Sequence, residues 1–137
     1  DHVANDFIYA MAKSTGAGIN AVSLCANSAV LSCLANDVGY EEVFSEQLAV
    51  SAKPGDVLIV LSGSGNSSNV VRALEMAKQL SVTTASVVGF DGGKCKKLAD
   101  LPIHFAVNDM QISEDLQLVV GHMIMKWMQR KIQNSVV

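Results

Sequence analysis

The strongest constraint on the fold is a short segment in which an unbroken apolar run passes directly into a loop of serine and glycine. The run covers residues 57–61, Val-Leu-Ile-Val-Leu, and the serine loop covers residues 62–69, Ser-Gly-Ser-Gly-Asn-Ser-Ser-Asn. A strand that is apolar on both faces is typical of a covered parallel sheet. Such sheets bind ligands beyond the carboxyl ends of their strands. The segment therefore predicts a strand, a ligand-binding loop and a following helix.

The composition of the serine loop favours a phosphate group as the ligand. Small side chains let the backbone approach an anion closely, and the N–H groups of a helix N-terminus point at it. The groups expected to bind phosphate are Ser62, Gly63, Ser64 and Ser67, with the backbone N–H groups from Gly63 to Ser68. The alternative is a loop that only caps its helix, for which one hydroxyl would suffice.

The serine loop differs from the common nucleotide-binding motifs. It has no Lys after its last glycine, as a Walker A motif would, and it lacks the G-x-G-x-x-G spacing of a dinucleotide site. Backbone dipoles and hydroxyls alone suit a phosphomonoester on a neutral polyol better than a triphosphate with its metal. A sugar phosphate or a mononucleotide therefore fits best.

The bulk composition predicts one domain over residues 1–137 that associates with other subunits. Half of the residues are hydrophobic and 17% are charged, so we expect apolar surface to be buried against another subunit. No apolar run is long enough for a membrane span, and the net charge of -3 argues against nucleic acid. Three cysteines without C-x-x-C spacing indicate reduced thiols in a cytoplasmic protein.

The rest of the chain alternates between helical and strand-like patterns. Helices are expected around residues 3–11, at 27–37, 40–48, 70–80 and 94–99, and from an N-cap at Ser113 to about residue 132. Strands are expected at residues 19–24, 57–61, 83–89 and 103–107. This order predicts a parallel α/β sandwich with right-handed crossovers. The last helix is apolar on nearly every face, so we expect it to be buried all round.

Three motifs in the chain match one known family. They are Asn36-Asp37-Val38-Gly39 with Phe44, Gly55-Asp56-Val57 with the serine loop, and Asp91-Gly92-Gly93-Lys94 with Ala99-Asp100. Together they resemble the sugar isomerase (SIS) domain family, most closely its phosphoheptose isomerase branch. The resemblance implies a three-layer α/β/α sandwich, flavodoxin-like and doubly wound, around a central parallel sheet. The family's Gly-Asn-Gly-Gly-Ser loop should precede His2, so we expect the chain to lack an N-terminal part.

The resemblance also implies a function. It indicates an aldose-ketose isomerase that converts a sugar phosphate, such as sedoheptulose 7-phosphate, to a heptose 7-phosphate for lipopolysaccharide or capsule. The expected enzyme is a cytoplasmic homotetramer with sites at subunit interfaces, binds neither nucleic acid nor membrane, and requires no cofactor. The alternative is a non-catalytic SIS module that binds sugar phosphates and regulates other proteins.

The catalytic residues that the resemblance implies are Asp6 and His122. Asp6 would act as the base, although the family has the longer Glu there, and His122 would shuttle protons on the sugar oxygens. We expect neighbouring subunits to complete this pair. Glu114, which replaces a family Gln, is expected to orient substrate together with Asn36 and Asp37. Without the resemblance, Asp6 reads as a solvated carboxylate and His122 as a core or interface residue.

Four of the polar side chains could also hold a metal. His2 and Asp6 are four residues apart on one helix face, and Glu114 and His122 are two turns apart on another. Two histidines and two carboxylates suit Zn²⁺, which some phosphoheptose isomerases bind at the matching positions. The alternative is that both pairs are ordinary surface residues. His104, within a strand pattern, is interpreted as structural.

Overall fold

The computed structural model describes residues 1–134, which divide into two compact units. The larger unit comprises residues 27–117, and the smaller comprises residues 1–26 with the last helix from Leu118 onward. None of the helices within the described residues has the length and apolarity that a membrane crossing needs. The single domain over residues 1–137 stays a prediction.

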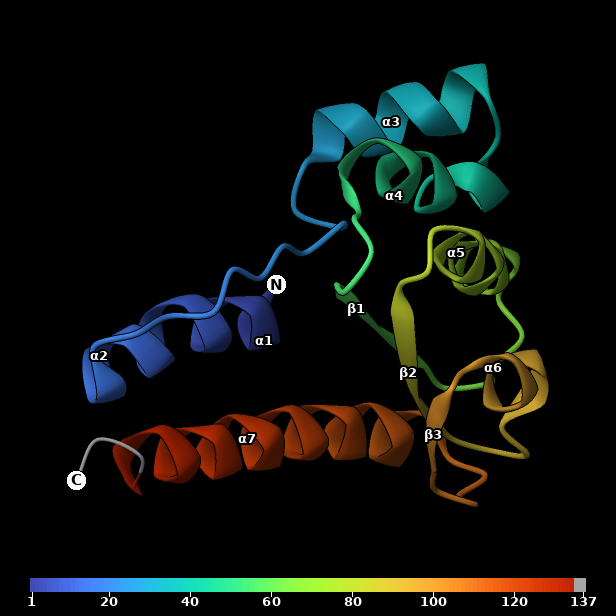
Figure 1. Ribbon diagram of the computed structural model, residues 1–137. Helices are drawn as coiled ribbons and strands as arrows, with labels where there is room; N and C mark the ends of the chain where they lie inside the picture. Colours follow the sequence, from blue (N-terminus) through green and yellow to red (C-terminus); the bar gives the residue numbers. More distant parts are fainter. Residues whose placement is uncertain (135–137) are drawn as a thin grey trace. The chain divides into compact units, whose positions relative to one another are not determined.

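The larger unit is built on a parallel sheet of three strands. They are β1 (Val57–Ser62), β2 (Thr83–Val88) and β3 (Leu101–His104), in the order β1-β2-β3. Val57 lies opposite Thr83, and Ala85 lies opposite Leu101. The connecting helices are α5 (Ser68–Gln79) and α6 (Gly93–Leu98), which cover one face of the sheet (Figure 1). The predicted parallel α/β class is confirmed.

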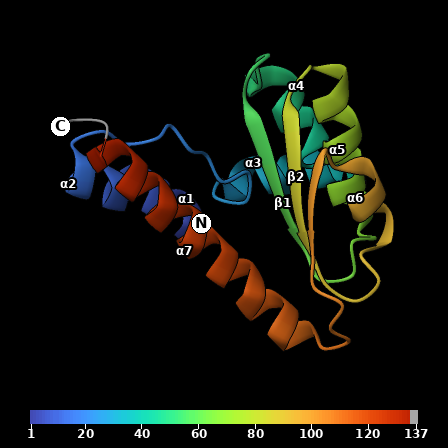
Figure 2. The same cartoon turned by 60° about the horizontal axis from the view of Figure 1, so that its bottom comes forward.

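Three further helical segments precede the sheet. They are α3 (Ser28–Asp37), the 3-10 turn η2 (Tyr40–Glu42) and α4 (Ser45–Ser51). Figure 2 shows α4 on the same side of the sheet as α5 and α6. The helix expected at residues 40–48 is interrupted after Glu42, and α4 begins at Ser45. The hydroxyl of the buried Ser45 donates to the Glu42 carboxylate at 2.5 Å, which joins the two helical segments.

The core of the larger unit lies between the sheet and the two connecting helices. Its buried members are Val60, Val71, Leu74, Val88 and Cys95. Burial raises the pKa of the Cys95 thiol. The opposite face of β1 is exposed in the described chain, since its apolar side chains there keep about half of their surface. The expectation that β1 is covered on both faces is therefore met on one face only.

Two strand predictions need correction. The strand expected at residues 103–107 begins two residues earlier, at Leu101. The strand expected at residues 19–24 is absent from the described chain, where this segment has no regular structure. The N–H of Ile19 donates instead to the carbonyl of Phe7 at 3.0 Å, and the Ile19 side chain packs on Phe7 and its neighbours. The alternating apolar pattern of this segment is compatible with a strand, but the packing of Ile19 on the N-terminal helix determines its conformation instead.

The last helix, α7 (Met110–Asn134), begins before the predicted N-cap. Asp109 caps it, because its carboxylate accepts from the N–H of Ile112 at 2.9 Å. Ser113 lies inside the first turns, buried, with its hydroxyl donating to the Asp109 carbonyl. The prediction of Ser113 as the cap is therefore wrong by one turn.

The smaller unit pairs the N-terminal helix with the second half of α7. The N-terminal helix consists of α1 (His2–Asn5), the π-helical segment η1 (Asp6–Ala10) and α2 (Met11–Thr15). Gln129 donates to the carbonyl of Ala10 and Gln133 to that of Ser14, so the two helices run in the same direction. Their shared core contains Phe7, Met11 and Met125.

One face of α7 in the smaller unit is exposed. Val119, Met123 and Trp127, spaced by four residues, keep 48%, 66% and 61% of their accessible surface. The expectation of a helix that is buried all round is therefore wrong for the single chain. Residues four apart share a helix face, so these three side chains form one apolar stripe.

Candidate active site

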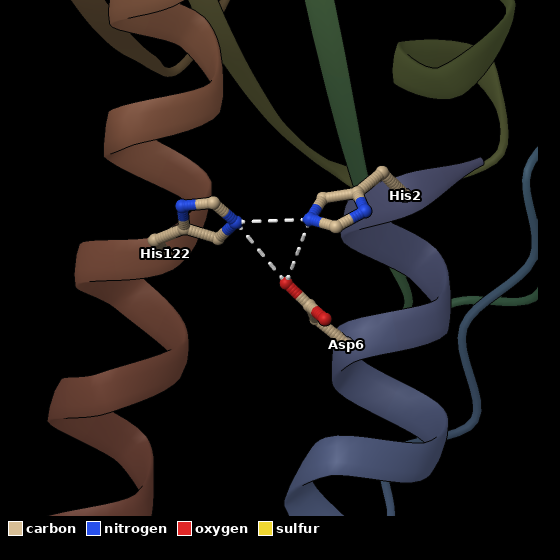
Figure 3. A group of neighbouring side chains, drawn as sticks. All are labelled: His2, Asp6 and His122. Carbon is tan, nitrogen blue, oxygen red and sulfur yellow. Dashed lines mark hydrogen bonds and ion pairs between the residues drawn. The ribbon is translucent and has the colours of Figure 1, made fainter.

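Three polar side chains of the smaller unit converge on one point (Figure 3). The Nε2 atoms of His2 and His122 lie 3.1 Å apart. The Oδ2 atom of Asp6 lies 3.5 Å from Nε2 of His2 and 3.3 Å from Nε2 of His122. We call these residues the His-Asp-His group. One chain supplies all of them, so the expectation that neighbouring subunits complete the Asp6–His122 pair is corrected.

The packing of the two helices brings the group together. His2 and Asp6 are one turn apart on the N-terminal helix, and η1 begins at Asp6. Gly121 lets α7 approach closely, because a Cβ atom there would lie 2.8 Å from a methyl carbon of Val3. Its neighbour His122 is thereby held against the N-terminal helix. Asp6 is the most enclosed of the three, with 16% of its side chain exposed.

The geometry of the His-Asp-His group fits a divalent metal. The three separations of 3.1, 3.3 and 3.5 Å resemble the edges of a tetrahedron. Around zinc with bonds of about 2.0–2.1 Å, such edges measure about 3.4 Å. Two imidazoles and a carboxylate are ligands that zinc accepts, and a fourth position would remain open. Glu114 belongs to the larger unit, and its role as a fourth ligand stays a prediction.

Space is available beside the group. His122 borders an open hollow of about 460 Å³ along α7, lined also by Met123, Trp127 and two cationic side chains, Lys126 and Arg130. The hollow lies over the stripe of Val119, Met123 and Trp127, so in the single chain it leaves the His122 imidazole accessible from this side.

The serine loop of the larger unit connects β1 to α5, as predicted. Ser67 is the N-cap residue of α5, but its hydroxyl makes no capping hydrogen bond. Within residues 1–134, neither Ser67 nor Ser68 uses its exposed hydroxyl in a hydrogen bond. These two hydroxyls therefore do not cap α5 in the described chain, and phosphate binding by the loop stays a prediction.

The first two serines of the loop have a second role. The hydroxyl oxygen of the buried Ser62 accepts from the N–H of Gly65 at 3.1 Å, and that of Ser64 accepts from the N–H of Asn66 at 3.2 Å. Two of the backbone N–H groups expected to bind phosphate are therefore already bonded within the loop. Each hydroxyl still keeps its own proton to donate.

A glycine turn, residues 90–93, and the first turn of α6 that follows it support the serine loop. The N–H of Lys94 donates to Oδ1 of Asn66 at 3.1 Å, and the N–H of Cys95 donates to the carbonyl of Gly65 at 2.9 Å. A Cβ atom at position 65 would lie 2.1 Å from the carbonyl oxygen of Gly92, so the close approach requires glycine. Sequence reasoning missed this support, although the Asp91-Gly92-Gly93 motif was its signal.

Asn36 and Asp37 lie at the exposed end of α3. The Asn36 amide donates to the Asp37 carboxylate at 2.7 Å, and no hydrogen bond among the described residues joins either side chain to the serine loop. The hydrogen bond from Cys33 to Asp37, together with the negative charge of Asp37, raises the pKa of the Cys33 thiol. Their role in orienting a substrate stays a prediction.

Comparisons with known proteins agree with this class of fold. The structure defines the class of fold, which is a parallel α/β unit with a hydroxyl-rich loop after its first strand. The sequence profile described as SIS domain matches residues 1–89. The chain therefore belongs to the SIS domain family.

The similar proteins are phosphoheptose isomerases. The one from Helicobacter pylori (strain Shi470) is 39% identical over 118 residues, which cover 86% of this chain and 62% of the relative. The one from Akkermansia muciniphila is 37% identical over 114 residues, which cover 83% of this chain and 60% of the relative. The chain thus spans about three fifths of the length of these relatives.

Two solved structures of the same name are similar in fold. Phosphoheptose isomerase GmhA from Neisseria gonorrhoeae has a TM-score of 0.83 and 27% identity, covering 91% of this chain and 66% of that one. A phosphoheptose isomerase from Francisella tularensis has a TM-score of 0.87, covering 94% and 69%. Its 19% identity supports the fold alone.

Proposed function

We propose that this chain is the catalytic SIS domain of a phosphosugar isomerase, which interconverts the aldose and ketose forms of a sugar phosphate such as sedoheptulose 7-phosphate. The observation that carries the proposal is the 3.3 Å approach of Asp6 to His122, which are 116 residues apart in sequence. A carboxylate beside an imidazole, bordering a hollow, is suited to proton transfer. The similarity to phosphoheptose isomerases supports the same reaction.

The proposed chemistry moves one proton between adjacent carbons. Asp6 removes the proton from the carbon next to the carbonyl group, which leaves an enediol, and returns it to the former carbonyl carbon. His122 moves the hydroxyl proton to the neighbouring oxygen in the same cycle. Electrons and atoms balance within the sugar, so the reaction needs neither oxidant nor reductant, and we propose that no organic cofactor takes part.

The serine loop holds the phosphate end of the substrate in this proposal. Ser62, Ser64 and Ser67 donate hydroxyl protons, and the N-terminus of α5 adds the helix dipole. Each lost hydroxyl should weaken binding by about 1–3 kcal/mol. Glu114, Asn36 and Asp37 are proposed to orient the sugar.

A divalent metal is compatible with the same residues. His2, Asp6 and His122 would hold it, with Glu114 as the proposed fourth ligand, so the metal-bound form is an alternative to proton transfer by the free Asp6 and His122 side chains. When bound, the metal would polarise the substrate's carbonyl oxygen as a Lewis acid.

We propose a cytoplasmic homotetramer. The exposed stripe of Val119, Met123 and Trp127 supports association between subunits. Because one chain carries both Asp6 and His122, each subunit should contain its own catalytic pair. Mixing inactive Asp6→Asn and His122→Ala subunits should therefore restore no activity once exchange of subunits is demonstrated. Partial recovery would show that the pair is formed between chains.

The direct test is turnover by the complete protein that carries this chain. Pentose, hexose and heptose phosphates would be offered, and the aldose and ketose products measured. Asp6→Asn and His122→Ala should each lower kcat about 10²–10⁴-fold with little change in sugar phosphate affinity. Asp115→Asn, an exposed carboxylate on α7, is the matched control. Full activity in either variant would reject the roles, and binding without any turnover would favour the regulatory module.

A further inference from the structure

His104, the last residue of β3, contacts the glycine turn (residues 90–93) that supports the serine loop. We propose that His104 is a positioning residue, which holds the glycine turn against the serine loop and thereby sets the affinity for the substrate's phosphate. The proposal rests on the proposed function of the loop. It assigns a role to a histidine that is distant in sequence from the catalytic pair.

The two contacts of the His104 ring define its protonation. Its Nε2 atom lies 2.9 Å from the carbonyl oxygen of Phe90, which can only accept, so Nε2 carries the proton. Its Nδ1 atom lies 3.0 Å from the Lys96 ammonium group, which can only donate, so Nδ1 is unprotonated. Both contacts are satisfied by one neutral tautomer of the ring.

The carbonyl that His104 holds belongs to a residue with an unusual backbone. Phe90 has a φ of 47°, in the left-handed region that residues other than glycine rarely adopt. Its N–H donates to the carbonyl of Val107 at 3.0 Å, so Phe90 is held on both sides. Such a conformation persists only where its surroundings impose it. The His104 hydrogen bond is one of those restraints.

The glycine turn transmits this restraint to the serine loop. Gly92 lies against Gly65, and a Cβ atom at Gly93 would lie 2.6 Å from the Ser64 carbonyl oxygen. The N–H groups of Lys94 and Cys95 bond to Asn66 and Gly65, as described above. A shift of the turn therefore moves the backbone of Ser64, Gly65 and Asn66. This backbone carries the Ser64 hydroxyl and leads directly to Ser67, and the proposed function assigns both hydroxyls to phosphate.

Paired substitutions of His104 test the proposal in the complete protein. The Gln amide can reach the position of Nε2 and donate to Phe90, whereas the shorter Asn amide cannot. His104→Asn should therefore weaken binding of sedoheptulose 7-phosphate about tenfold, the effect of one lost hydrogen bond, with kcat unchanged. His104→Gln should restore binding close to that of the parent. Calorimetry gives the affinity, and steady-state kinetics gives the division between KM and kcat.

A second measurement does not depend on how the variants fold. ¹⁵N NMR of the ring nitrogens in the parent protein should show the Nε2-protonated tautomer of His104, and the opposite tautomer would overturn the proposal. Parent-like affinity in His104→Asn, while Ser64→Ala and Ser67→Ala bind more weakly, would reject the role of His104 alone. If those serine variants bind as tightly as the parent, or the parent does not bind, the proposed function of the loop fails, and this inference fails with it.

Discussion

Replacing Gly65 by Ala tests the contact between the serine loop and the glycine turn. Gly65 has a φ of 67°, and a Cβ atom there would lie 2.1 Å from the carbonyl oxygen of Gly92 and 2.7 Å from its carbon. Both atoms belong to backbone that is itself hydrogen-bonded, so neither can move aside as a flexible side chain would. The loop or the turn must therefore shift.

Two costs contribute to the expected loss of stability. The left-handed backbone conformation costs Ala about 1–2 kcal/mol relative to Gly. The steric overlap requires a shift of nearly 1 Å, and overpacking of this kind costs about 1–3 kcal/mol. Gly65→Ala should therefore lower the free energy of unfolding by about 2–5 kcal/mol.

Gly55→Ala is the matched control, because Gly55 has a φ of 95° and no described residue beyond its chain neighbours places an atom within 4 Å of the position of a Cβ atom. It carries the backbone cost alone, about 1–2 kcal/mol. Urea unfolding of both variants gives the difference, and calorimetry with a sugar phosphate should show weaker binding in Gly65→Ala only. If Gly65→Ala is no less stable than Gly55→Ala, the close contact with Gly92 does not exist.

Three further outcomes are expected. Hydrogen bonds from Thr84 lower the pKa of Asp100 in the folded protein. The folding stability that these bonds contribute is therefore complete above the ordinary pKa near 3.8, and it is lost as the pH falls through the lowered pKa. Thr84→Val should therefore be less stable than the parent at pH 7, with a smaller difference in acid, by urea unfolding at both pH values. Leu74→Ala, at a fully buried site, should cost about 2–5 kcal/mol in the same assay, whereas Val50→Ala, at an exposed site, should cost under about 0.5 kcal/mol. His2→Ala removes one of three clustered ligand atoms and should weaken zinc binding more than about tenfold in a chelator competition. Unchanged zinc affinity would exclude this group as the metal site.

The parts of the fold that depend on neighbouring residues could be predicted from the sequence. The apolar run before the serine loop forms β1, and the helical period after it forms α5, because each pattern matches one local geometry. The segment of residues 19–24 could not be predicted in this way. Its apolar alternation is compatible with a strand, but its conformation is determined by contact with Phe7, which is distant from most of it in sequence.

The candidate site, too, could be predicted from spacing only where its residues are close in sequence. The spacing of His2 and Asp6 places them on one helix face, which sequence alone indicates. Nothing in the spacing brings His122 to them, and only the resemblance to a known family suggested that pairing. The support of the serine loop by the glycine turn depends on backbone atoms in close contact, and the positions of glycines do not reveal which partner each of them faces.

The hydroxyls of the serine loop differ in what their loss would change. The Ser64 oxygen accepts from the N–H of Asn66, so Ser64→Ala removes a donor to the ligand and also releases a backbone group that shapes the loop. Among the described residues Ser67 makes no such bond, so Ser67→Ala removes the donor alone. Both variants should bind a sugar phosphate more weakly, by about 1–3 kcal/mol for a single hydroxyl. Only Ser64→Ala should also unfold at lower urea concentration, and equal stability of the two variants would contradict the structural role of the Ser64 hydroxyl.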